Sequence, residues 1–335
     1  MKKVGIKDIA RETNLSISTV SRVMNGKAEE FRISKQSQEI ILETAKRLDY
    51  NANYAAANLR YGKSNTIALV IPTLSNPFFA RLASEINDDF ITEGYSTILG
   101  ESGEKIELEE NILKTLVSRD VDGLVIAPCT DSFEHILRLR DRGLPIVCMD
   151  RYFKNLNIPY VSTDNYKGSY MATKLLIENG HKDILAIQGV KKSTPNNQRL
   201  AGFKAALMEE GIDTFTVAGN DFTAQNGYLE TRLAFQKVSK PTAILAFSNT
   251  IALGCLKAIK EKKLNVPEDV SLICFDDHPY LDFLSTPLTC IVQPETEIAK
   301  LSARFLFANI NKTPLESDQV LLEPSIKMRD SIKKL

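Results

Sequence analysis

The sequence predicts a small all-α head followed by a larger α/β body of two lobes, each built on a parallel sheet. Three observations support this prediction. The first 60 residues show helical periodicity and no strand pattern, whereas the chain after Thr66 alternates short apolar runs with helical stretches. The apolar runs are continuous, as in strands buried on both faces of a parallel sheet. They are too many for one small sheet, so two similar halves are expected.

Length, composition and cysteine usage limit the class of protein. A chain of 335 residues with 43% hydrophobic and 25% charged residues is typical of a globular protein of two or three domains. No apolar run approaches the ~18 residues of a membrane span, and the N-terminus lacks the apolar region of a signal peptide. The five cysteines form no CxxC pair, so we expect buried free thiols. These features predict a cytoplasmic protein without membrane contact.

The net charge of zero hides an asymmetry between the two parts of the chain. Residues 1–63 hold 12 Lys and Arg against 7 Asp and Glu, and the remainder is acidic by the same margin. A basic head on an acidic body indicates a polyanionic partner for the head alone.

Three helices are expected in the head. The first covers residues 7–14, a short turn at Asn14 and Leu15 follows, and the second lies between Ser16 and Asn25. A third, longer pattern follows Ser34. Ser16 and Ser34 are well placed as N-caps of the second and third helices. One face of the third helix is expected to carry Ile40, Ile41, Thr44, Ala45 and Leu48.

The first two helices divide their faces as a helix-turn-helix requires, because the second helix must pack on the first and still offer polar side chains to the major groove. Leu15, Val20 and Val23 are expected to turn inward. Hydroxyls and amides suit phosphate contacts, and an arginine suits guanine. The predicted phosphate contacts are Ser16, Thr19, Ser21 and Asn25, and the predicted base contacts are Ile17, Ser18 and Arg22. The alternative is a small helical bundle that contacts another protein.

The body is expected to begin with the run TIALVIP. Strands are predicted at residues 66–72, 96–100, 123–128, 146–150, 160–164, 184–189, 243–249 and 271–277. The pattern restarts near residues 160–165, so we place the break between the lobes there.

The stretch IKDIARETNLSISTVSRVMNG resembles the DNA-binding head of the lac repressor/galactose repressor family, whose signature is TVSRVLNG. Other stretches are similar to family blocks in the same order, among them NANYAAANLR, LSNPFFARL, NQRLAGF, NDFTAQNGY, ALGCLKAIKEKKLNVPEDVSLICFDD and PLTCIVQP. The resemblance covers essentially the whole chain. It implies a transcriptional repressor with a body like that of periplasmic sugar-binding proteins, controlled by an effector bound between two lobes.

The resemblance also implies a domain division and a homodimer. The expected parts are a head (1–50), a hinge helix (51–63) and a body (64–335), with lobe 1 at about 64–162 and 291–322 and lobe 2 at about 163–290 and 323–335. Two heads would read the half-sites of a palindromic operator, with Asn53 on DNA and Leu59 wedged into the minor groove. Ala52 and Ala57 depart from the family's proline and frequent arginine. The C-terminal tail is too short for a tetramerisation helix, so a dimer is expected.

Effector contacts are expected at the carboxyl ends of the strands, where the crevice of an open α/β sheet lies. Aromatic faces and paired polar groups there suit a polyhydroxylated ring. The predicted effector contacts are Phe78, Phe79, Arg151, Arg199, Phe222, Asn249 and Asp276. Asn249 matches the first residue of a family Asn-Asp pair, but Thr250 replaces the second. Arg151 suits a sugar, a sugar phosphate or a carboxylate equally well, and a nucleobase or a phosphoprotein partner stays open as the effector.

Enzymatic function is not expected. The chain contains no P-loop, GxSxG, HExxH or glycine-rich nucleotide motif, and its three histidines are far apart in the sequence. We therefore predict no cofactor and no metal. A solute-binding protein is a distant alternative, and a sugar kinase would require phosphate-binding glycine loops.

Overall fold

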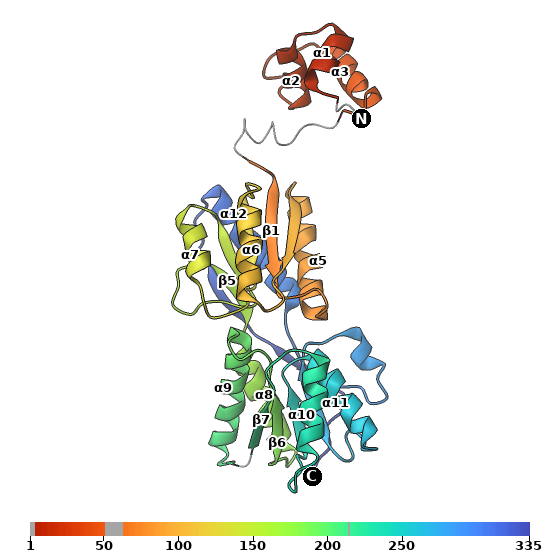
Figure 1. Cartoon of the computed structure of the whole chain (residues 1–335), viewed down its shortest axis with the longest axis vertical. Helices are drawn as coiled ribbons and strands as arrows, with labels where there is room; N and C mark the ends of the chain where they lie inside the picture. The colour runs from red at the N-terminus through yellow and green to blue at the C-terminus, as the bar shows by residue number, and fades with distance from the viewer. Residues whose placement is uncertain (1–3, 51–62, 214) are drawn as a thin grey trace. The chain divides into compact units, whose positions relative to one another are not determined.

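The computed structural model describes residues 4–50, 63–213 and 215–335, and it divides into two compact units, Met1–Ser64 and Asn65–Leu335. The predicted hinge contacts Asn53 and Leu59, and the departures Ala52 and Ala57, lie outside the described residues. Figure 1 shows the helical first unit and the two α/β lobes of the second.

The first unit contains three helices, α1 (Ile6–Thr13), α2 (Ile17–Met24) and α3 (Lys35–Arg47). Both predicted N-caps are confirmed, because Ser16 Oγ accepts the Thr19 N–H and Ser34 Oγ accepts the Ser37 N–H. The helices enclose a small core of Ile9, Ala10, Val20, Val23, Ala28, Ile41 and Ala45, and Leu15 packs against it. The inward positions predicted for α2 are therefore confirmed.

The prediction for Ile40 was wrong. Its side chain is 43% exposed, whereas its neighbour Ile41 is fully buried. Adjacent residues of an α-helix are separated by ~100° around the axis, so both cannot point into one core. Ile41 takes the inward position together with Thr44 and Ala45.

Lobe 1 of the second unit is a six-stranded parallel sheet with helices on both faces (Figure 1). Its strands are β1 (Thr66–Ile71), β2 (Ser96–Glu101), β3 (Gly123–Ile126), β4 (Ile146–Met149), β5 (Tyr160–Thr163) and β11 (Gln319–Leu322), in the order β11-β5-β4-β3-β1-β2. Its helices are α5 (Pro77–Thr92), α6 (Ile106–Val117), α7 (Glu134–Asp141) and α12 (Glu295–Asn311).

The continuous apolar run of β1 is explained by these two helical layers. Ile67, Leu69 and Ile71 face the core formed with α5 and α12, while Ala68 and Val70 face the core formed with α6 and α7. Because successive strand residues point to opposite faces, both sets must be apolar when both faces are covered.

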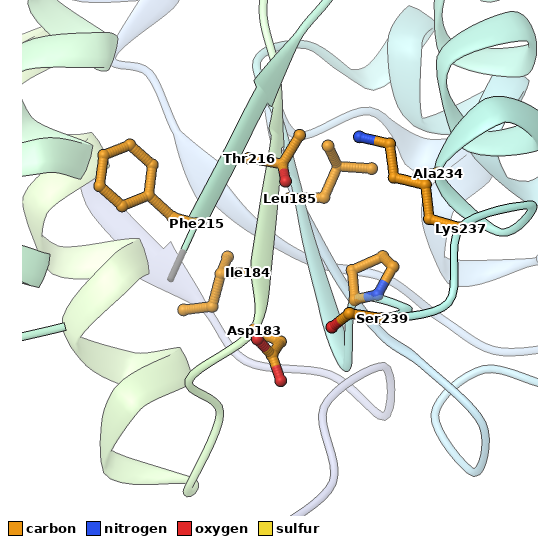
Figure 2. Close-up of a pocket in the computed structure, with 9 residues that line it drawn as sticks. Asp183, Ile184, Leu185, Phe215, Thr216, Ala234, Lys237 and Ser239 are labelled. Carbon is orange, nitrogen blue, oxygen red and sulfur yellow. The ribbon is translucent and has the colours of Figure 1, made fainter. Parts of the chain in front are cut away.

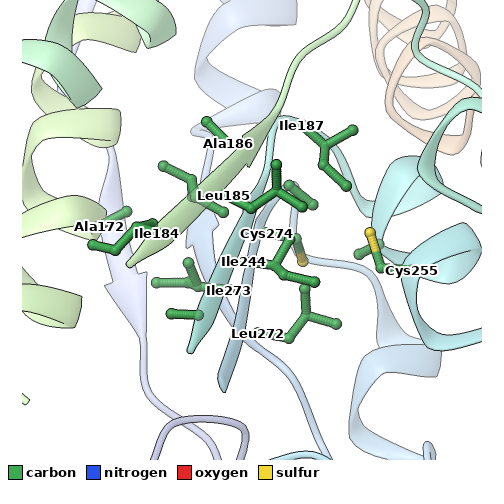
Figure 3. Close-up of a cluster of buried hydrophobic side chains, with 14 of the residues drawn as sticks. Ala172, Ile184, Leu185, Ala186, Ile187, Ile244, Cys255, Leu272, Ile273 and Cys274 are labelled. Atoms are coloured by element: carbon green, nitrogen blue, oxygen red, sulfur yellow. The ribbon is translucent and has the colours of Figure 1, made fainter. Parts of the chain in front are cut away.

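Lobe 2 has the same strand order and differs at one edge. Its strands are β6 (Ile184–Ile187), β7 (Phe215–Ala218), β8 (Ala243–Ala246), β9 (Ser271–Phe275), β10 (Thr289–Val292) and β12 (Ser325–Lys327), in the order β12-β10-β9-β8-β6-β7 with β12 antiparallel. Its helices are α8 (Asn165–Glu178), α9 (Thr194–Glu209), α10 (Ala224–Ala234) and α11 (Asn249–Glu261). Figure 3 shows the aliphatic core that these strands share with the helices around them.

The two-lobed α/β architecture was predicted correctly, but four strands were missed. β7, β11 and β12 are only partly buried, so they lack the continuous apolar run that marked the other strands. β10 lies wholly in the second sheet, so the chain leaves lobe 2 after Val292 rather than at the expected residue 290. The first passage between lobes lies at Asp164, whose side chain accepts the Lys167 N–H and caps α8.

Two glycines allow the helices of lobe 2 to pack closely. A Cβ added to Gly202 of α9 would lie 2.1 Å from the carbonyl oxygen of Tyr166 in α8. A Cβ on Gly254 of α11 would lie 1.9 Å from the carbonyl oxygen of Ala224 in α10. Any larger residue would separate these helix pairs.

All five cysteines are buried and free, as predicted. In the described part of the chain, no helix is long and apolar enough to cross a membrane. The same residues contain no cluster of three or more His, Cys, Asp or Glu side chains suited to a metal ion.

Candidate functional site

The outer face of α2 carries most of the residues predicted to contact DNA. Ile17, Ser18, Arg22 and Asn25 are exposed, and Ile17 leaves 51% of its surface open although it is apolar. Ser16 is also exposed, whereas Thr19 and Ser21 are half-buried. An exposed isoleucine at the start of a helix can meet base edges, and the polar residues around it can meet phosphates. The structure thus presents the predicted set on one surface.

Hydrogen bonds within the helix hold several of these side chains in place. Ser16 Oγ lies 2.8 Å from Ser18 Oγ and 2.7 Å from Thr19 Oγ1. The Asn25 amide donates to the Ser21 carbonyl oxygen at 2.5 Å. The polar surface of α2 is therefore partly ordered by bonds within the helix.

The sequence reasoning missed Phe31. The Arg22 guanidinium lies 3.9 Å from the centre of the Phe31 ring, a cation–π contact. Phe31 is itself exposed and belongs to the long segment GKAEEFRISK after α2. This stacking limits the rotamers of Arg22 at the exposed surface of α2.

A cavity lies where the carboxyl ends of the strands in the two lobes meet. It is small, with a volume of about 20 Å³. Its walls are Asn76, Phe78, Phe79, Asp150, Arg151, Pro195, Arg199, Phe222, Ser248, Asp276 and Gln293. Six of the seven predicted effector contacts are among them. Since one water molecule requires ~10–15 Å³ by the same measure, a sugar can enter only after the walls move apart.

Asn249 is the predicted residue that does not line the cavity. It is the first residue of α11, is almost fully buried, and its Oδ1 has no hydrogen-bond partner. The preceding residue, Ser248, lines the cavity, and its Oγ caps α11 by accepting the Ile251 N–H. Asn249 therefore lies next to the cavity wall, and its predicted contact with an effector stays a prediction.

The aromatic wall comes from the start of α5. Asn76 caps this helix through its Oδ1, which accepts the Phe78 N–H at 3.1 Å, and Pro77 occupies the first turn. Phe78 and Phe79 follow, 5% and 4% exposed, with ring centres 5.2 Å apart in an edge-to-face arrangement. Both rings also belong to the lobe 1 core, so they are core residues and cavity walls at once.

Two aspartates occupy matching positions in the two sheets. Asp150 follows β4 with a φ of 66°, and Asp276 follows β9 with a φ of 74°. Aspartate is one of the few residues that tolerates this left-handed region. Burial raises the pKa of Asp150 to about 6, although Arg151 and Arg199 oppose this shift. Burial also raises the pKa of Asp276, against the influence of Arg199 and Gln293.

The two arginines of the cavity have different partners. Arg151 forms a bidentate ion pair with Glu104, with Nη1–Oε2 and Nη2–Oε1 distances of 2.7 and 2.6 Å. Arg199 Nε donates to Asn165 Oδ1 at 2.7 Å, and Nη1 donates to the Phe247 carbonyl oxygen at 2.5 Å. Its guanidinium also lies 3.9 Å from the Phe275 ring centre. Arg199 is therefore held by neutral groups, and Asp276 and Asp150 are its nearby opposing charges.

Gln293 connects the lobes beside the cavity. Its amide donates to Asp276 Oδ1 at 2.6 Å, and its Oε1 accepts the Thr163 hydroxyl at 2.6 Å. Thr163 ends β5 of lobe 1, and Asp276 follows β9 of lobe 2. Gln293 thus links the end of β5 in lobe 1 to the residue that follows β9 in lobe 2. Gln293 belongs to the family-like stretch PLTCIVQP, but nothing in that stretch predicted its contact with Asp276.

A larger cavity of about 250 Å³ lies elsewhere in lobe 2 (Figure 2). It opens at the starts of β6 and β7, the opposite ends of the strands from the lobe crevice. Its walls are mainly apolar, with Asp183 and Lys237 among them. None of the predicted site residues line it.

Comparisons with known proteins place the chain in a family. Residues 5–53 match the model of bacterial regulatory proteins of the lacI family, and residues 173–332 match a periplasmic binding protein-like domain. A ribose operon repressor of Halalkalibacterium halodurans is 33% identical over 98% of this chain and 97% of its own length. Catabolite control protein A of Priestia megaterium is 32% identical over 98% of this chain and 99% of its own length. The chain belongs to the lacI family.

Solved structures agree with this assignment. A lacI-family regulator from Enterococcus faecium with bound ribose has a TM-score of 0.74 at 29% identity, over 81% of this chain and 99% of that one. The lac repressor dimer bound to operator has a TM-score of 0.87 over 99% of this chain and 100% of that one, and its 24% identity supports the fold alone. As a lacI-family member, the protein is a DNA-binding transcriptional regulator.

Proposed function

We propose that this lacI-family regulator is a homodimeric repressor that binds a palindromic operator and responds to a neutral pentose such as ribose. The regulator would act in the bacterial cytoplasm on genes for carbohydrate use. The observation that supports the effector class is the composition of the lobe cavity. Two buried phenylalanines face two arginines and two aspartates there. Aromatic faces suit the apolar faces of a sugar ring, and charged groups suit its hydroxyls through paired hydrogen bonds.

The relatives support the same class. The names of the H. halodurans protein and the E. faecium structure both refer to ribose. A purine repressor of Histophilus somni is also 31% identical over 98% of this chain, so the test panel must include nucleobases. The cavity itself favours a sugar, because its charged groups outnumber the aromatic faces that a purine would occupy.

The small size of the cavity suggests a mechanism. A ligand that enters must widen a space of about 20 Å³, and separation of the lobes would act on the Thr163–Gln293–Asp276 hydrogen bonds that join them. Effector binding is thereby coupled to the angle between the lobes. Coupling is reciprocal, so an inducer must bind better to the form with low DNA affinity, and a co-repressor to the DNA-bound form.

The effector proposal is tested by a thermal-shift screen of purified protein with pentoses, hexoses, sugar phosphates, sugar acids and purines. We expect D-ribose or a close neutral pentose to raise the melting temperature most, because ligands that bind only the folded state stabilise it. If only purines raise the melting temperature, a nucleobase replaces the pentose as the proposed effector. If stabilisation requires an added phosphoprotein, the small-molecule proposal fails.

The DNA proposal assigns base contacts to Ile17, Ser18 and Arg22 and a minor-groove wedge to Leu59. Operator sequences would be selected from a random library and the affinities measured over a range of salt concentrations. Arg22→Ala is expected to lower affinity for the selected palindrome and relax the base preference, while non-specific affinity changes less. Leu59→Ala should likewise weaken specific binding alone, since a wedge contributes through DNA deformation. Equal loss on random DNA would contradict both roles.

A further inference from the structure

The geometry points to Glu104 as the residue that makes the lobe cavity select uncharged sugars over sugar phosphates and sugar acids. This inference rests on the proposed function, because it concerns the ligand of the same cavity. Glu104 does not line the cavity and acts through Arg151, which does. Glu104 is therefore expected to affect ligand selectivity without contacting the ligand.

The ion pair is built into the fold of lobe 1. Glu104 follows β2 in a turn where Gly103 and Glu104 both have positive φ values, 57° and 59°. The turn is tied to β1, since the Ser102 N–H donates to the Ile71 carbonyl and the Gly103 N–H to the Pro72 carbonyl. This backbone places the carboxylate opposite the guanidinium of Arg151.

The arrangement uses both carboxylate oxygens and both terminal nitrogens of the guanidinium. The Nη1–Oε2 and Nη2–Oε1 distances of 2.7 and 2.6 Å are those of a strong bidentate pair. Nη1 also donates to the Pro128 carbonyl at 3.2 Å. Arg151 is 3% exposed and Glu104 23%, so the pair is shielded on the arginine side and reached by water on the glutamate side. The guanidinium thus enters the cavity wall with its charge already compensated.

The charge balance of the site follows. Asp150, Asp276 and Glu104 provide three carboxyl groups against the two guanidinium groups of Arg151 and Arg199. With all five groups ionised the net charge is −1, and protonation of Asp150 brings it to zero. Without Glu104 the corresponding values are zero and +1. An added phosphate or carboxylate would therefore enter a site with no excess positive charge, and at short range within a protein such repulsion is weakly screened.

By residue type alone, Arg151 suits a sugar, a sugar phosphate and a carboxylate equally well, and its pairing with Glu104 distinguishes among them. A neutral sugar needs hydrogen-bond donors and acceptors and no net charge, which the paired site provides. A sugar phosphate or acid needs an excess of positive charge, which two guanidinium groups against three carboxyl groups do not provide. Arg199 is held by neutral partners and has Asp276 and Asp150 as its nearby opposing charges. The position of Glu104 decides between these ligand classes.

The experiment compares binding of D-ribose, 5-O-methyl-D-ribose and D-ribose 5-phosphate to the full-length protein by calorimetry. The methyl ether controls for the added bulk at the 5-position. In the wild type we expect D-ribose to bind at least roughly tenfold more tightly than its 5-phosphate. Glu104→Gln should shift the ratio of the two affinities toward the phosphate by roughly tenfold or more, since it removes one negative charge and keeps the size of the side chain.

Two further variants serve as controls. Glu101→Gln removes the same charge three residues earlier, where the Glu101 carboxylate accepts the Leu74 N–H and does not contact Arg151. It should leave the affinity ratio of the wild type unchanged. Glu104→Asp keeps the charge and should keep the preference for the neutral sugar. Melting temperatures verify that each variant is folded.

The outcomes are distinct. Suppose that the wild type binds D-ribose and that a folded Glu104→Gln protein has the same ratio of affinities for D-ribose and its 5-phosphate. The role of Glu104 is then overturned, and the proposed function still stands. If that variant binds all three ligands more weakly by the same factor, the role is also overturned, because Glu104 would then only maintain the structure of the cavity. If the variant does not fold, the wild type decides: tighter binding of the 5-phosphate than of D-ribose contradicts the inference. A wild type that binds neither overturns the proposed effector class and this inference together.

Discussion

The two lobes use the same position of the fold for opposite charges. In each lobe an aspartate with positive φ follows the fourth strand along the chain, Asp150 after β4 and Asp276 after β9. The next residue is Arg151 in lobe 1 and Asp277 in lobe 2. Arg151 lines the cavity and is paired with Glu104, whereas Asp277 lies outside it. Asp277 accepts hydrogen bonds from Arg329 at 2.6 Å and Lys327 at 3.2 Å.

The comparison shows that each lobe neutralises this charge with its own residues. Burial alone would raise the pKa of Asp277, but the hydrogen bonds from Arg329 and Lys327 prevail and lower it. The ion pair with Glu104 likewise keeps Arg151 charged although burial opposes its charge. Arg199, by contrast, has no direct ion pair with a described carboxylate, and the two matching aspartates are its nearby opposing charges. Four predictions test this division of roles.

The largest effect is expected for Arg199→Ala. Of the two arginines that line the cavity, Arg199 is the one without a direct ion pair to a described carboxylate. Its loss is expected to remove charge-assisted hydrogen bonds to the ligand and leaves Asn165 Oδ1 without its donor. The dissociation constant for D-ribose should rise roughly a hundredfold, or ~2.7 kcal/mol, by calorimetry. Lys192→Ala removes an exposed cation nearby in sequence and should change little. If Arg199→Ala binds D-ribose with an affinity within threefold of the wild type, Arg151 would be the arginine that forms these hydrogen bonds instead.

The second prediction concerns Glu295, a carboxylic acid at the start of α12 whose side chain is 6% exposed. Burial, followed by the nearby Asp276, raises its pKa to about 8, against the effect of Arg81. The folded state therefore holds a proton that the unfolded state releases above its ordinary pKa near 4.5. This contribution to stability is full below pH 4.5 and is lost as the pH rises to about 8, at up to ~1.4 kcal/mol per pH unit.

Glu295→Gln cannot ionise, so it should gain stability relative to the wild type as the pH rises from 5 to 8. Urea denaturation at several pH values measures the difference in free energy of unfolding. Glu85→Gln is the control, because Glu85 also contacts Arg81, at 3.8 Å, but is a third exposed. Parallel pH profiles for wild type and Glu295→Gln would show that Glu295 is ionised in the folded protein.

The third prediction compares the two ion pairs directly. Double-mutant cycles on Arg151 with Glu104 and on Arg329 with Asp277 should each give a coupling free energy of about 1 kcal/mol in unfolding experiments. The expected value is modest because Glu104 and Asp277 remain partly exposed, which weakens the attraction. A cycle on Arg151 with Asp277 is expected to be additive. A measurable coupling free energy in only one lobe would contradict the expectation that both ion pairs contribute alike.

The smallest effect is expected for Gly189→Ala in lobe 2. A Cβ at this position would lie 2.3 Å from two ring carbons of Phe222, which lines the cavity. The ring must shift, so affinity for D-ribose should fall roughly threefold with little change in melting temperature, as a lost stacking contact is worth under ~1 kcal/mol. In a Phe222→Ala background the glycine substitution should have no additional effect. If the two substitutions lower the affinity for D-ribose additively, the effect of Gly189→Ala arises from the backbone and not from displacement of the Phe222 ring.

Much of the fold could be predicted from local patterns. Strands with continuous apolar runs, such as β1, and the serine caps of α2 and α3 leave a direct signal in the sequence. The half-buried strands β7, β11 and β12 leave little signal, because their pairing depends on segments far away in the chain. The burial of Ile41 in place of Ile40 was a matter of helix phase that only packing resolves.

The candidate sites divide in the same way. Arg151, Arg199, Asp276 and the phenylalanines could be found because unusual residues at the carboxyl ends of parallel strands meet in one crevice. Glu104 and Gln293 could not, since each acts through a partner 47 or 17 residues away. The contact of Phe31 with Arg22 could not be predicted either, because it depends on how the segment after α2 packs against this helix.

The sequence by itself determined the helix-turn-helix, the α/β body, the family resemblance and the kinds of side chain at the crevice, because these depend on residue type, spacing and periodicity. The tertiary structure alone decided which charges are neutralised and which face the cavity. Glu104 pairs with Arg151, whereas Arg199 is held by Asn165 and the Phe247 carbonyl. Electrostatic interactions act through distance and burial, and both are set by how segments distant in the chain come together.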